Sequence, residues 1–222
     1  MIGKSLLAMI TLAGKNMKFL FQTPKIIRQL YKNSLWKIKT NQPELYLTFD
    51  DGPIAELTPW VLDTLSKYGA KATFFCVGEN VKRHTEIVER MMKEGHSIGN
   101  HTFNHLNGWK TKNKMYLQNV HEFQKLIKTK LFRPPYGKIK MFQFNKLKKA
   151  YQIVFWDVLS HDYHSKMNPI TCLNNSIKYT RNGSIIVFHD NIKAENNLKY
   201  VLPRYIEHFL QLNYKFLPLK DT

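Results

Sequence analysis

Short apolar runs alternate with amphipathic stretches from residue 45 almost to the C-terminus. A short apolar run bounded by turn residues is typical of a buried strand, whereas apolar positions three and four apart are typical of a helix with one buried face. The runs predict strands at 45–49, 72–78, 97–100, 131–133, 153–157, 184–189 and 215–217. The amphipathic stretches predict helices at 59–68, 86–94, 116–129, 142–150, 169–179 and 198–212.

The alternation of strand and helix is the repeating unit of a parallel sheet or barrel. About seven such units follow one another without a linker, a low-complexity segment or a sequence repeat. No glycine-rich dinucleotide fingerprint follows a predicted strand. The number of units and the missing fingerprint favour an α/β barrel of the TIM type over an open Rossmann sheet.

The first 43 residues differ from the rest, because they contain eight Lys and Arg and no acidic residue before Glu44. Lys4 and the apolar run after it have the outline of a weak signal sequence. The run is shorter than the ~20 apolar residues that span a bilayer. An alternative is that translation starts at Met17, which would make residues 1–16 an upstream extension.

Residues 19–36 predict a basic amphipathic helix that is broken at Pro24. Such a helix either lies on a membrane or packs on the domain, and we favour packing because surface helices carry the same stripe. The predicted organisation is therefore a basic N-terminal segment, residues 1–43, followed by one domain, residues 44–222.

Composition places the chain among globular proteins and adds a strong positive charge. Of 222 residues, 43% are hydrophobic, and 34 Lys and Arg stand against 16 Asp and Glu, which gives a net charge of +18. Such a charge favours an anionic partner, such as a cell-wall polymer, a membrane surface or nucleic acid. Because the basic residues are mostly dispersed lysines without a nucleic-acid module, we expect no nucleic-acid partner. Cys76 and Cys172 lie in apolar stretches and predict buried free thiols, with one disulfide as the alternative.

Polar residues capable of chemistry follow most of the predicted strands. They are Asp50 and Asp51, His101, Arg133, Asp157 and His189. The carboxyl ends of parallel strands form one edge, which is where α/β enzymes keep their active sites. Asp50 and Asp51 point in opposite directions along a strand, so the pair is expected to serve two roles, such as a base and a metal ligand.

His101 and His105 are four residues apart, which places both imidazoles on one face if the loop opens a helix. Two imidazoles and one carboxylate are a common catalytic metal set, and Asp51 is the obvious third ligand. The alternative is a pair of loop histidines without a metal. The other histidines, at positions 84, 96, 121, 164 and 208, have no such neighbours and are interpreted as surface or core residues.

Five motifs occur in the order and approximate spacing of a known family. They are Thr48-Phe49-Asp50-Asp51-Gly52, His101 to His105, Arg133 to Gly137, Asp157 to Tyr163, and Val187-Phe188-His189. In these residues the chain resembles the polysaccharide deacetylases, the NodB-homology enzymes of carbohydrate esterase family 4, and especially their short single-domain bacterial members. The resemblance covers roughly residues 44–219. It implies a distorted (β/α)7 barrel and metal-dependent removal of N-acetyl groups from GlcNAc-containing glycans such as peptidoglycan or chitin.

The resemblance also implies a metal and its ligands. Asp51, His101 and His105 are expected to hold Zn2+, with Co2+ as an alternative ion. Asp50 is expected to be the base that activates the attacking water, and Arg133 to orient Asp50.

Three further residues receive roles from the resemblance. The backbone N–H of Tyr136 is expected to stabilise the oxyanion, and His189 to protonate the leaving amine while Asp162 tunes it. Tyr163, His161 and Val187 depart from the usual motif residues, which bears on substrate specificity more than on activity.

Two other functions stay open. An O-acetyl esterase acting on acetylated xylan or another glycan would use the same metal site. A catalytically inactive carbohydrate-binding barrel is disfavoured by the complete set of base, ligands and acid. We expect an N-acetylated glycan as substrate, an anionic cell-wall or membrane surface as neighbour, and a monomer. The signal-like N-terminus favours the cell envelope or export, with the cytoplasm as the alternative.

Overall fold

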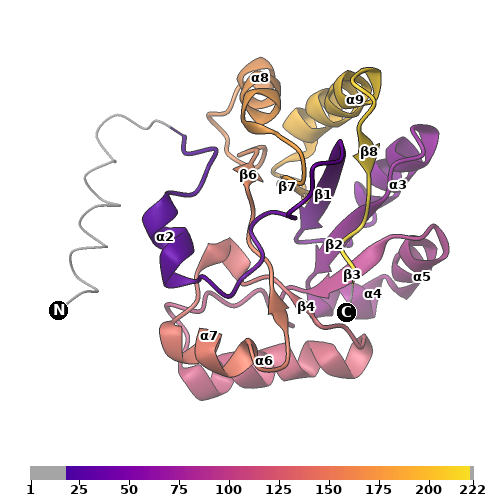
Figure 1. Cartoon of the computed structure of the whole chain (residues 1–222). Coiled ribbons are helices and arrows are strands. Elements are labelled where there is room, and N and C mark those ends of the chain that lie inside the picture. Colours follow the sequence, from indigo (N-terminus) through magenta and orange to yellow (C-terminus); the bar gives the residue numbers. More distant parts are fainter. Residues whose placement is uncertain (1–18, 221–222) are drawn as a thin grey trace.

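The computed structural model describes residues 19–220 and shows one curled sheet surrounded by helices (Figure 1). The predicted signal sequence and the alternative start at Met17 lie outside the described residues. Within them the strands are β1 Glu44–Asp50, β2 Ala72–Cys76, β3 Ser97–Asn100, β4 Leu131–Phe132, β5 Gln152–Ile153, β6 Val158–Leu159, β7 Ile185–His189 and β8 Lys215–Phe216. The helices are α2 Lys25–Leu30, α3 Thr58–Lys67, α4 Gly78–Arg83, α5 Thr85–Lys93, α6 Asn113–Leu126, α7 Met141–Leu147, α8 Pro169–Tyr179 and α9 Glu195–Gln211.

The strands are parallel and follow the order β5-β4-β3-β2-β1-β7-β6, with β8 beside the start of β1. Helices ring the outer face of the curled sheet (Figure 1). The distorted (β/α)7 barrel expected from the sequence is confirmed. β5 and β6 are the two edges of the sheet.

β1 lies at the centre of this sheet. It pairs with β2 on one side and β7 on the other, so that Asp50 stands beside Phe75 and His189. Leu45, Leu47 and Phe49 are fully buried, as an apolar run covered on both faces should be. The central position delivers Asp50 and Asp51 to the middle of the carboxyl edge.

The predicted strand at 153–157 is wrong, because the chain there forms two short strands at opposite edges of the sheet. β5 pairs with β4, and β6 pairs with β7. Ile153, Val154 and Phe155 are all buried, so the apolar run continues through the break. Periodicity therefore gave no sign of it. The structure also contains α4, for which the sequence predicted no helix.

Residues 19–38, here called the N-terminal clasp, pack along both edges of the sheet. The N–H of Leu159 in β6 donates to Phe21 at 2.9 Å, and the N–H of Leu35 donates to Ile153 in β5 at 2.8 Å. Trp36 stacks on Phe155 with ring centroids 4.3 Å apart. Only α2 within the clasp is helical, so the predicted helix at 19–36 is too long. Ile27 and Tyr31 of this segment pack against buried residues of the domain.

The buried carboxylate of Asp157 holds helix α2 of the clasp against the sheet. Its carboxylate is fully buried and lies 2.9 Å from Arg28 in α2 and 2.9 Å from Arg181, while Ser184 donates to it at 2.8 Å. Although the sequence groups Asp157 with the polar strand-end residues, its carboxylate is engaged in holding α2 against the sheet.

The two cysteines are buried and free, as expected. Among residues 19–220, none of the helices has both the length and the apolar character needed to cross a membrane.

Candidate active site

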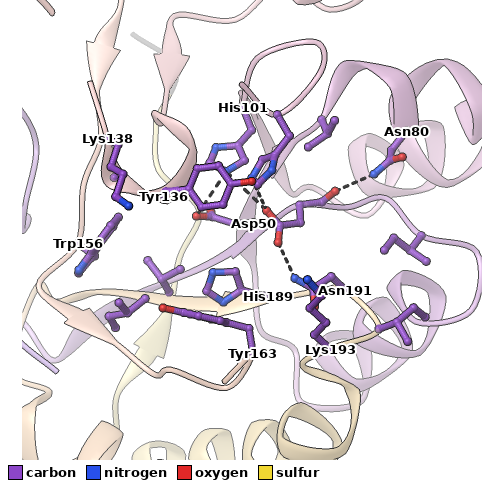
Figure 2. A pocket seen from close by; sticks show the side chains of 18 residues that line it. Asp50, Asn80, His101, Tyr136, Lys138, Trp156, Tyr163, His189, Asn191 and Lys193 are labelled. Atoms are coloured by element: carbon purple, nitrogen blue, oxygen red, sulfur yellow. Dashed lines mark hydrogen bonds and ion pairs between the residues drawn. The ribbon is translucent and has the colours of Figure 1, made fainter. Parts of the chain in front are cut away.

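A pocket of about 710 Å³ opens at the carboxyl edge of the sheet, lined by residues that follow β1, β3, β4 and β7 (Figure 2). Six of the eight predicted site residues line it: Asp50, Asp51, His101, His105, Tyr136 and His189. The other two, Arg133 and Asp162, are fully buried behind it. The structure therefore brings together residues that are spread over most of the chain.

Arg133, which is buried behind the pocket, fixes the orientation of the Asp50 carboxylate. The Arg133 Nη1 atom donates to Asp50 Oδ1 at 2.7 Å and to Thr48 Oγ1 at 2.7 Å, and its Nη2 atom donates to the carbonyl oxygen of Phe155 at 2.8 Å. The guanidinium also lies 4.1 Å from the ring centroid of Phe75. A planar, fully paired guanidinium holds a carboxylate in one orientation. The second oxygen of Asp50 is left facing the pocket, 4.0 Å from His101 Nε2.

Asp51, His101 and His105 each offer one ligand atom, and these atoms lie within 4.8 Å of one another. Asp51 Oδ1 is 3.0 Å from His105 Nε2 and 3.7 Å from His101 Nε2. Burial is the largest influence on Asp51 and opposes its ionisation, but the hydrogen bond with His105 and the nearby histidines together lower the pKa of Asp51 below its usual value. A carboxylate and two imidazoles are the donor types that zinc prefers.

His101 is held in the tautomer that a metal ligand needs. Its Nδ1–H donates to the carbonyl oxygen of Arg133 at 2.8 Å, because a carbonyl can only accept. Burial lowers the pKa of His101 to about 4, so the imidazole is neutral near pH 7. The lone pair of Nε2 is therefore free for a ligand.

The loop that carries both histidines is irregular, so the condition that it opens a helix is not met. Thr102 and His105 adopt positive φ angles of 64° and 54°, which are uncommon outside glycine. The side chain of Asn100 accepts from the Thr102 N–H at 2.8 Å, and Thr102 Oγ1 accepts from the Leu106 N–H at 3.0 Å. These hydrogen bonds stabilise the strained turn that brings the two imidazoles together.

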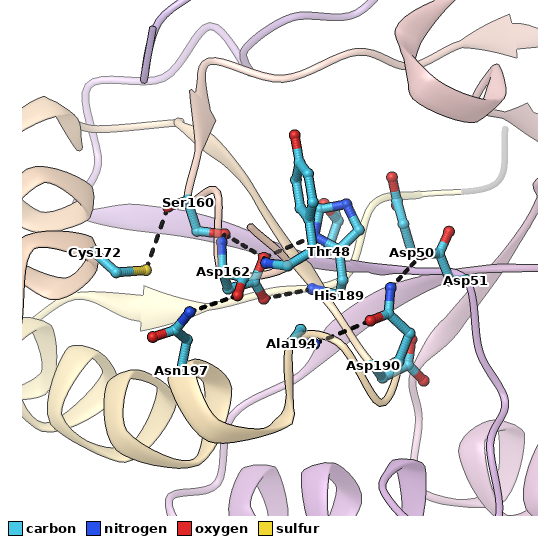
Figure 3. A network of polar contacts seen from close by, with 12 residues as sticks. Thr48, Asp50, Asp51, Ser160, Asp162, Cys172, His189, Asp190, Ala194 and Asn197 are labelled. Carbon is cyan, nitrogen blue, oxygen red and sulfur yellow. Dashed lines mark hydrogen bonds and ion pairs between the residues drawn. The ribbon is translucent and has the colours of Figure 1, made fainter. Parts of the chain in front are cut away.

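His189, at the end of β7, is paired with Asp162 (Figure 3). The His189 Nδ1–H donates to Asp162 Oδ1 at 2.8 Å, and the His189 backbone N–H donates to Asp162 Oδ2, also at 2.8 Å. Burial alone would lower the pKa of His189, but Asp162, with smaller contributions from Asp51 and Asp50, raises it to about 9. His189 therefore holds its proton at neutral pH.

Tyr136 lies in the 3₁₀ turn η2 (Pro135–Gly137) with a positive φ of 61°. Within the described part of the chain its backbone N–H has no hydrogen-bond acceptor. Its ring contacts His105 with centroids 4.6 Å apart. The loop thus offers a free N–H donor and an aromatic wall at the side of the pocket.

Sequence reasoning missed three residues: Asn80 and Asn191, which donate to Asp51, and Asp190, which accepts from the N–H of the next residue, Gly52. The signal for two of them was present, because Asp190 and Asn191 directly follow His189 at a strand end. Because Asp and Asn are also ordinary turn residues, the sequence alone did not predict that these two side chains make contacts at the site.

Comparisons with known proteins agree with this geometry. The family model described as "Polysaccharide deacetylase" matches residues 37–152. A peptidoglycan-N-acetylglucosamine deacetylase of Bacillus cereus is 34% identical over 194 residues, which cover 84% of this chain and 91% of that protein. A chitooligosaccharide deacetylase of Azorhizobium caulinodans is 33% identical over 162 residues, covering 69% and 77% of the two chains.

Solved structures show the same similarity. The crystal structure of a peptidoglycan N-acetylglucosamine deacetylase superposes with a TM-score of 0.79 at 32% identity and covers 89% of this chain and 95% of that one.

Proposed function

The chain belongs to the polysaccharide deacetylase family, and we propose that it uses a divalent metal ion, Zn2+ in the first instance, to remove N-acetyl groups from a GlcNAc-containing glycan. That the protein is a polysaccharide deacetylase follows from its relatives. The observation that carries the finer proposal is that a fixed carboxylate, a three-ligand cluster and a protonated histidine converge on one pocket.

The residues present fit a metal ion. Asp51, His101 and His105 would hold it, and three protein ligands leave room for water and substrate. The neutral, Nδ1-protonated His101 supports this assignment. When bound, a divalent cation polarises a carbonyl and lowers the pKa of water.

The remaining residues supply the proton transfers of amide hydrolysis. An amide is a poor electrophile with a poor leaving group, so a base must activate water and an acid must protonate the nitrogen. Asp50 is the base, because Arg133 holds one of its oxygens and leaves the other facing the pocket. His189 is the acid, because Asp162 keeps it protonated.

Tyr136 is placed to complete the site. The free backbone N–H is a donor for the oxygen that becomes negative as water attacks the carbonyl. The aromatic side chains of Tyr136, Trp156 and Tyr163 also line the pocket, where they can pack on the faces of sugar rings.

We infer that the natural substrate is a peptidoglycan-like polymer. Two observations support this: relatives that act on peptidoglycan and a net charge of +18. A basic protein is attracted to an anionic wall polymer. This substrate implies that the protein works at the cell envelope.

The test is acetate release from N-acetylchitooligosaccharides, peptidoglycan fragments and acetylated xylan by the full chain, after chelation and again after zinc is added back. Asp50→Asn should retain zinc binding and lose activity about 10²- to 10⁴-fold, the usual contribution of a general base. Asp63→Asn, which changes an exposed carboxylate on α3, is the matched control.

Activity that zinc restores in the wild type, and that Asp50→Asn lacks, would support the proposal. Acetate release only from acetylated xylan would instead favour an O-acetyl esterase. Zinc binding without turnover of any of these glycans would favour the carbohydrate-binding alternative.

A further inference from the structure

We propose that Asn191 is a positioning residue that sets the orientation of the Asp51 carboxylate for metal binding. The inference rests on the proposed function, because it assumes that Asp51 is a ligand. Asn191 lies in the loop after β7 and points toward the pocket (Figure 2). Its side-chain amide donates to Asp51 Oδ2 at 2.5 Å.

Because of this hydrogen bond, the two oxygens of the Asp51 carboxylate have different partners. Oδ2 receives the amide of Asn191, while Oδ1 faces His105 Nε2 at 3.0 Å and His101 Nε2 at 3.7 Å. A carboxylate without such a donor can rotate and present either oxygen or both. Asn191 therefore selects Oδ1 as the single ligand atom, which keeps the remaining metal positions for water and substrate.

Asn191 is itself held in place by the backbone N–H of Ala194. Its side-chain Oδ1 accepts from the Ala194 N–H at 3.1 Å, and its backbone carbonyl accepts from the same N–H at 3.0 Å. Because both ends of the side-chain amide are used, the assignment of its nitrogen and oxygen is consistent: the nitrogen donates to Asp51 and the oxygen accepts from Ala194.

The backbone around Asp51 is secured by separate contacts. Asp51 has a φ of 86°, which is uncommon for a residue with a side chain. Asn80 donates to the carbonyl oxygen of Asp51 at 2.8 Å. Asp190 accepts from the Gly52 N–H at 3.0 Å and from the Thr58 hydroxyl at 2.7 Å. These contacts fix the backbone of Asp51. Asn191 is therefore needed only to restrict the rotation of the Asp51 carboxylate.

The distinguishing variant is Asn191→Ser, in the full-length chain. A serine oxygen can still accept from Ala194, but its side chain is too short to replace the donor to Asp51. The matched control is Asn175→Ser, because among residues 19–220 the amide of Asn175 donates only to the carbonyl oxygen of Thr171 on its own helix, α8. Asn191→Thr is a second variant with the same logic, for use if serine disturbs folding.

Three measurements are made on metal-free protein: the dissociation constant for zinc by competition with a chromophoric chelator, the visible absorption spectrum after Co2+ is added, and the unfolding midpoint. Loss of a partner that orients a metal ligand typically weakens binding 10- to 100-fold. We expect a rise of that order in the zinc dissociation constant of Asn191→Ser, a changed Co2+ spectrum and an unchanged unfolding midpoint. Asn175→Ser should match the wild type in all three.

An Asn191→Ser variant that binds zinc as tightly as the wild type, or more tightly, with the wild-type Co2+ spectrum, overturns the inference even if its activity falls. This failure is distinct from failure of the proposed function, in which the wild type itself would bind no zinc or release no acetate.

Discussion

The hydrogen bond between His189 and Asp162 sets the pH range in which the imidazole holds its proton. Burial works against the charge, and Asp162 more than compensates, so the pKa of His189 is raised to about 9. The folded-state pKa is above the ordinary 6.5 of an unfolded histidine. The pair therefore stabilises the fold fully below pH ~6.5, and this stabilisation is lost as the pH rises through about 9.

We expect Asp162→Asn to lower the pKa of His189, because the variant removes the strongest opposing charge and leaves burial in force. The alkaline limb of the kcat profile should then move to lower pH, so that activity is lost more at pH 8 than at pH 6. The measurement is a pH–rate profile beside that of Asp63→Asn. An alkaline limb that does not move would show that His189 is not the acid.

His96 shows the opposite behaviour away from the pocket. Its Nδ1 atom accepts from the Ala72 N–H at 3.1 Å, so the ring must stay neutral to keep this bond. Burial, helped by the charge of Lys71, lowers the pKa of His96 to about 4, although Glu94 opposes the shift. Between pH 6.5 and 4 the unfolded chain binds a proton that the folded chain excludes, so acid destabilises the fold.

The expected result is that the free energy of unfolding falls by about 2 kcal/mol from this residue between pH 7 and pH 5. His96→Asn keeps an acceptor for Ala72 and removes the titration, so it should lose less stability over the same range. Urea unfolding at the two pH values measures the difference. His121→Asn, at an exposed position on α6, should behave as the wild type does; equal losses in all three proteins would contradict the argument.

At the scale of single residues, sequence reasoning found the groups whose chemistry is unusual. Paired acids and histidines at strand ends are rare enough to be noticed, and the structure places Asp50, Asp51, His101, His105 and His189 around one pocket. It did not find Asn80 or Asn191, because an asparagine in a loop has many ordinary uses. Their contacts depend on side-chain directions that only the folded loops define.

Among the elements, the N-terminal clasp includes an ion pair between Arg28 and a buried carboxylate. Asp157 is fully buried, and its partners are Arg28, Arg181 and Ser184. A buried carboxylate that loses a partner is destabilised, because no water replaces the lost contact.

We expect Arg28→Met to lower the free energy of unfolding by about 1–3 kcal/mol, since methionine keeps the packing on Trp36 but removes the charged hydrogen bond. Arg181→Met, whose guanidinium is half exposed, should cost less. Urea denaturation of both variants tests the order. If Arg181→Met were the more harmful, the clasp would not depend on Arg28.

Strands and helices with strong patterns were predicted well, and the break between β5 and β6 shows why one prediction failed. The helix at 169–179 matches α8, and the strand at 45–49 lies within β1. The predictions failed at α4 and at the break between β5 and β6. At the break the chain crosses from one edge of the sheet to the other while its side chains stay buried. The hydrophobic pattern therefore does not indicate where the strand ends.

For the whole molecule, the net charge of +18 should govern how substrates of different charge respond to salt. Two lysines, Lys138 and Lys193, lie on the wall of the pocket itself. Attraction between exposed charges is screened within about 8 Å at physiological ionic strength. We expect KM for anionic peptidoglycan fragments to rise with added salt, and KM for neutral chitooligosaccharides to stay constant.

The measurement is KM for both substrates across a range of salt concentrations, with Lys149→Gln as a control at an exposed position outside the pocket lining. An equal response of the two substrates would argue against electrostatic attraction.

The clasp also has a consequence for how this protein is made. Leu35 and Phe21 are synthesised early, yet they pair with Ile153 in β5 and Leu159 in β6, which are among the later parts of the chain to emerge. Contacts between residues so far apart in sequence form slowly. Until they form, the edge strands β5 and β6 offer unpaired backbone groups to other chains. We therefore expect newly made chains to be prone to aggregate before the clasp closes, and a chaperone that shields these edges to improve the yield of folded enzyme.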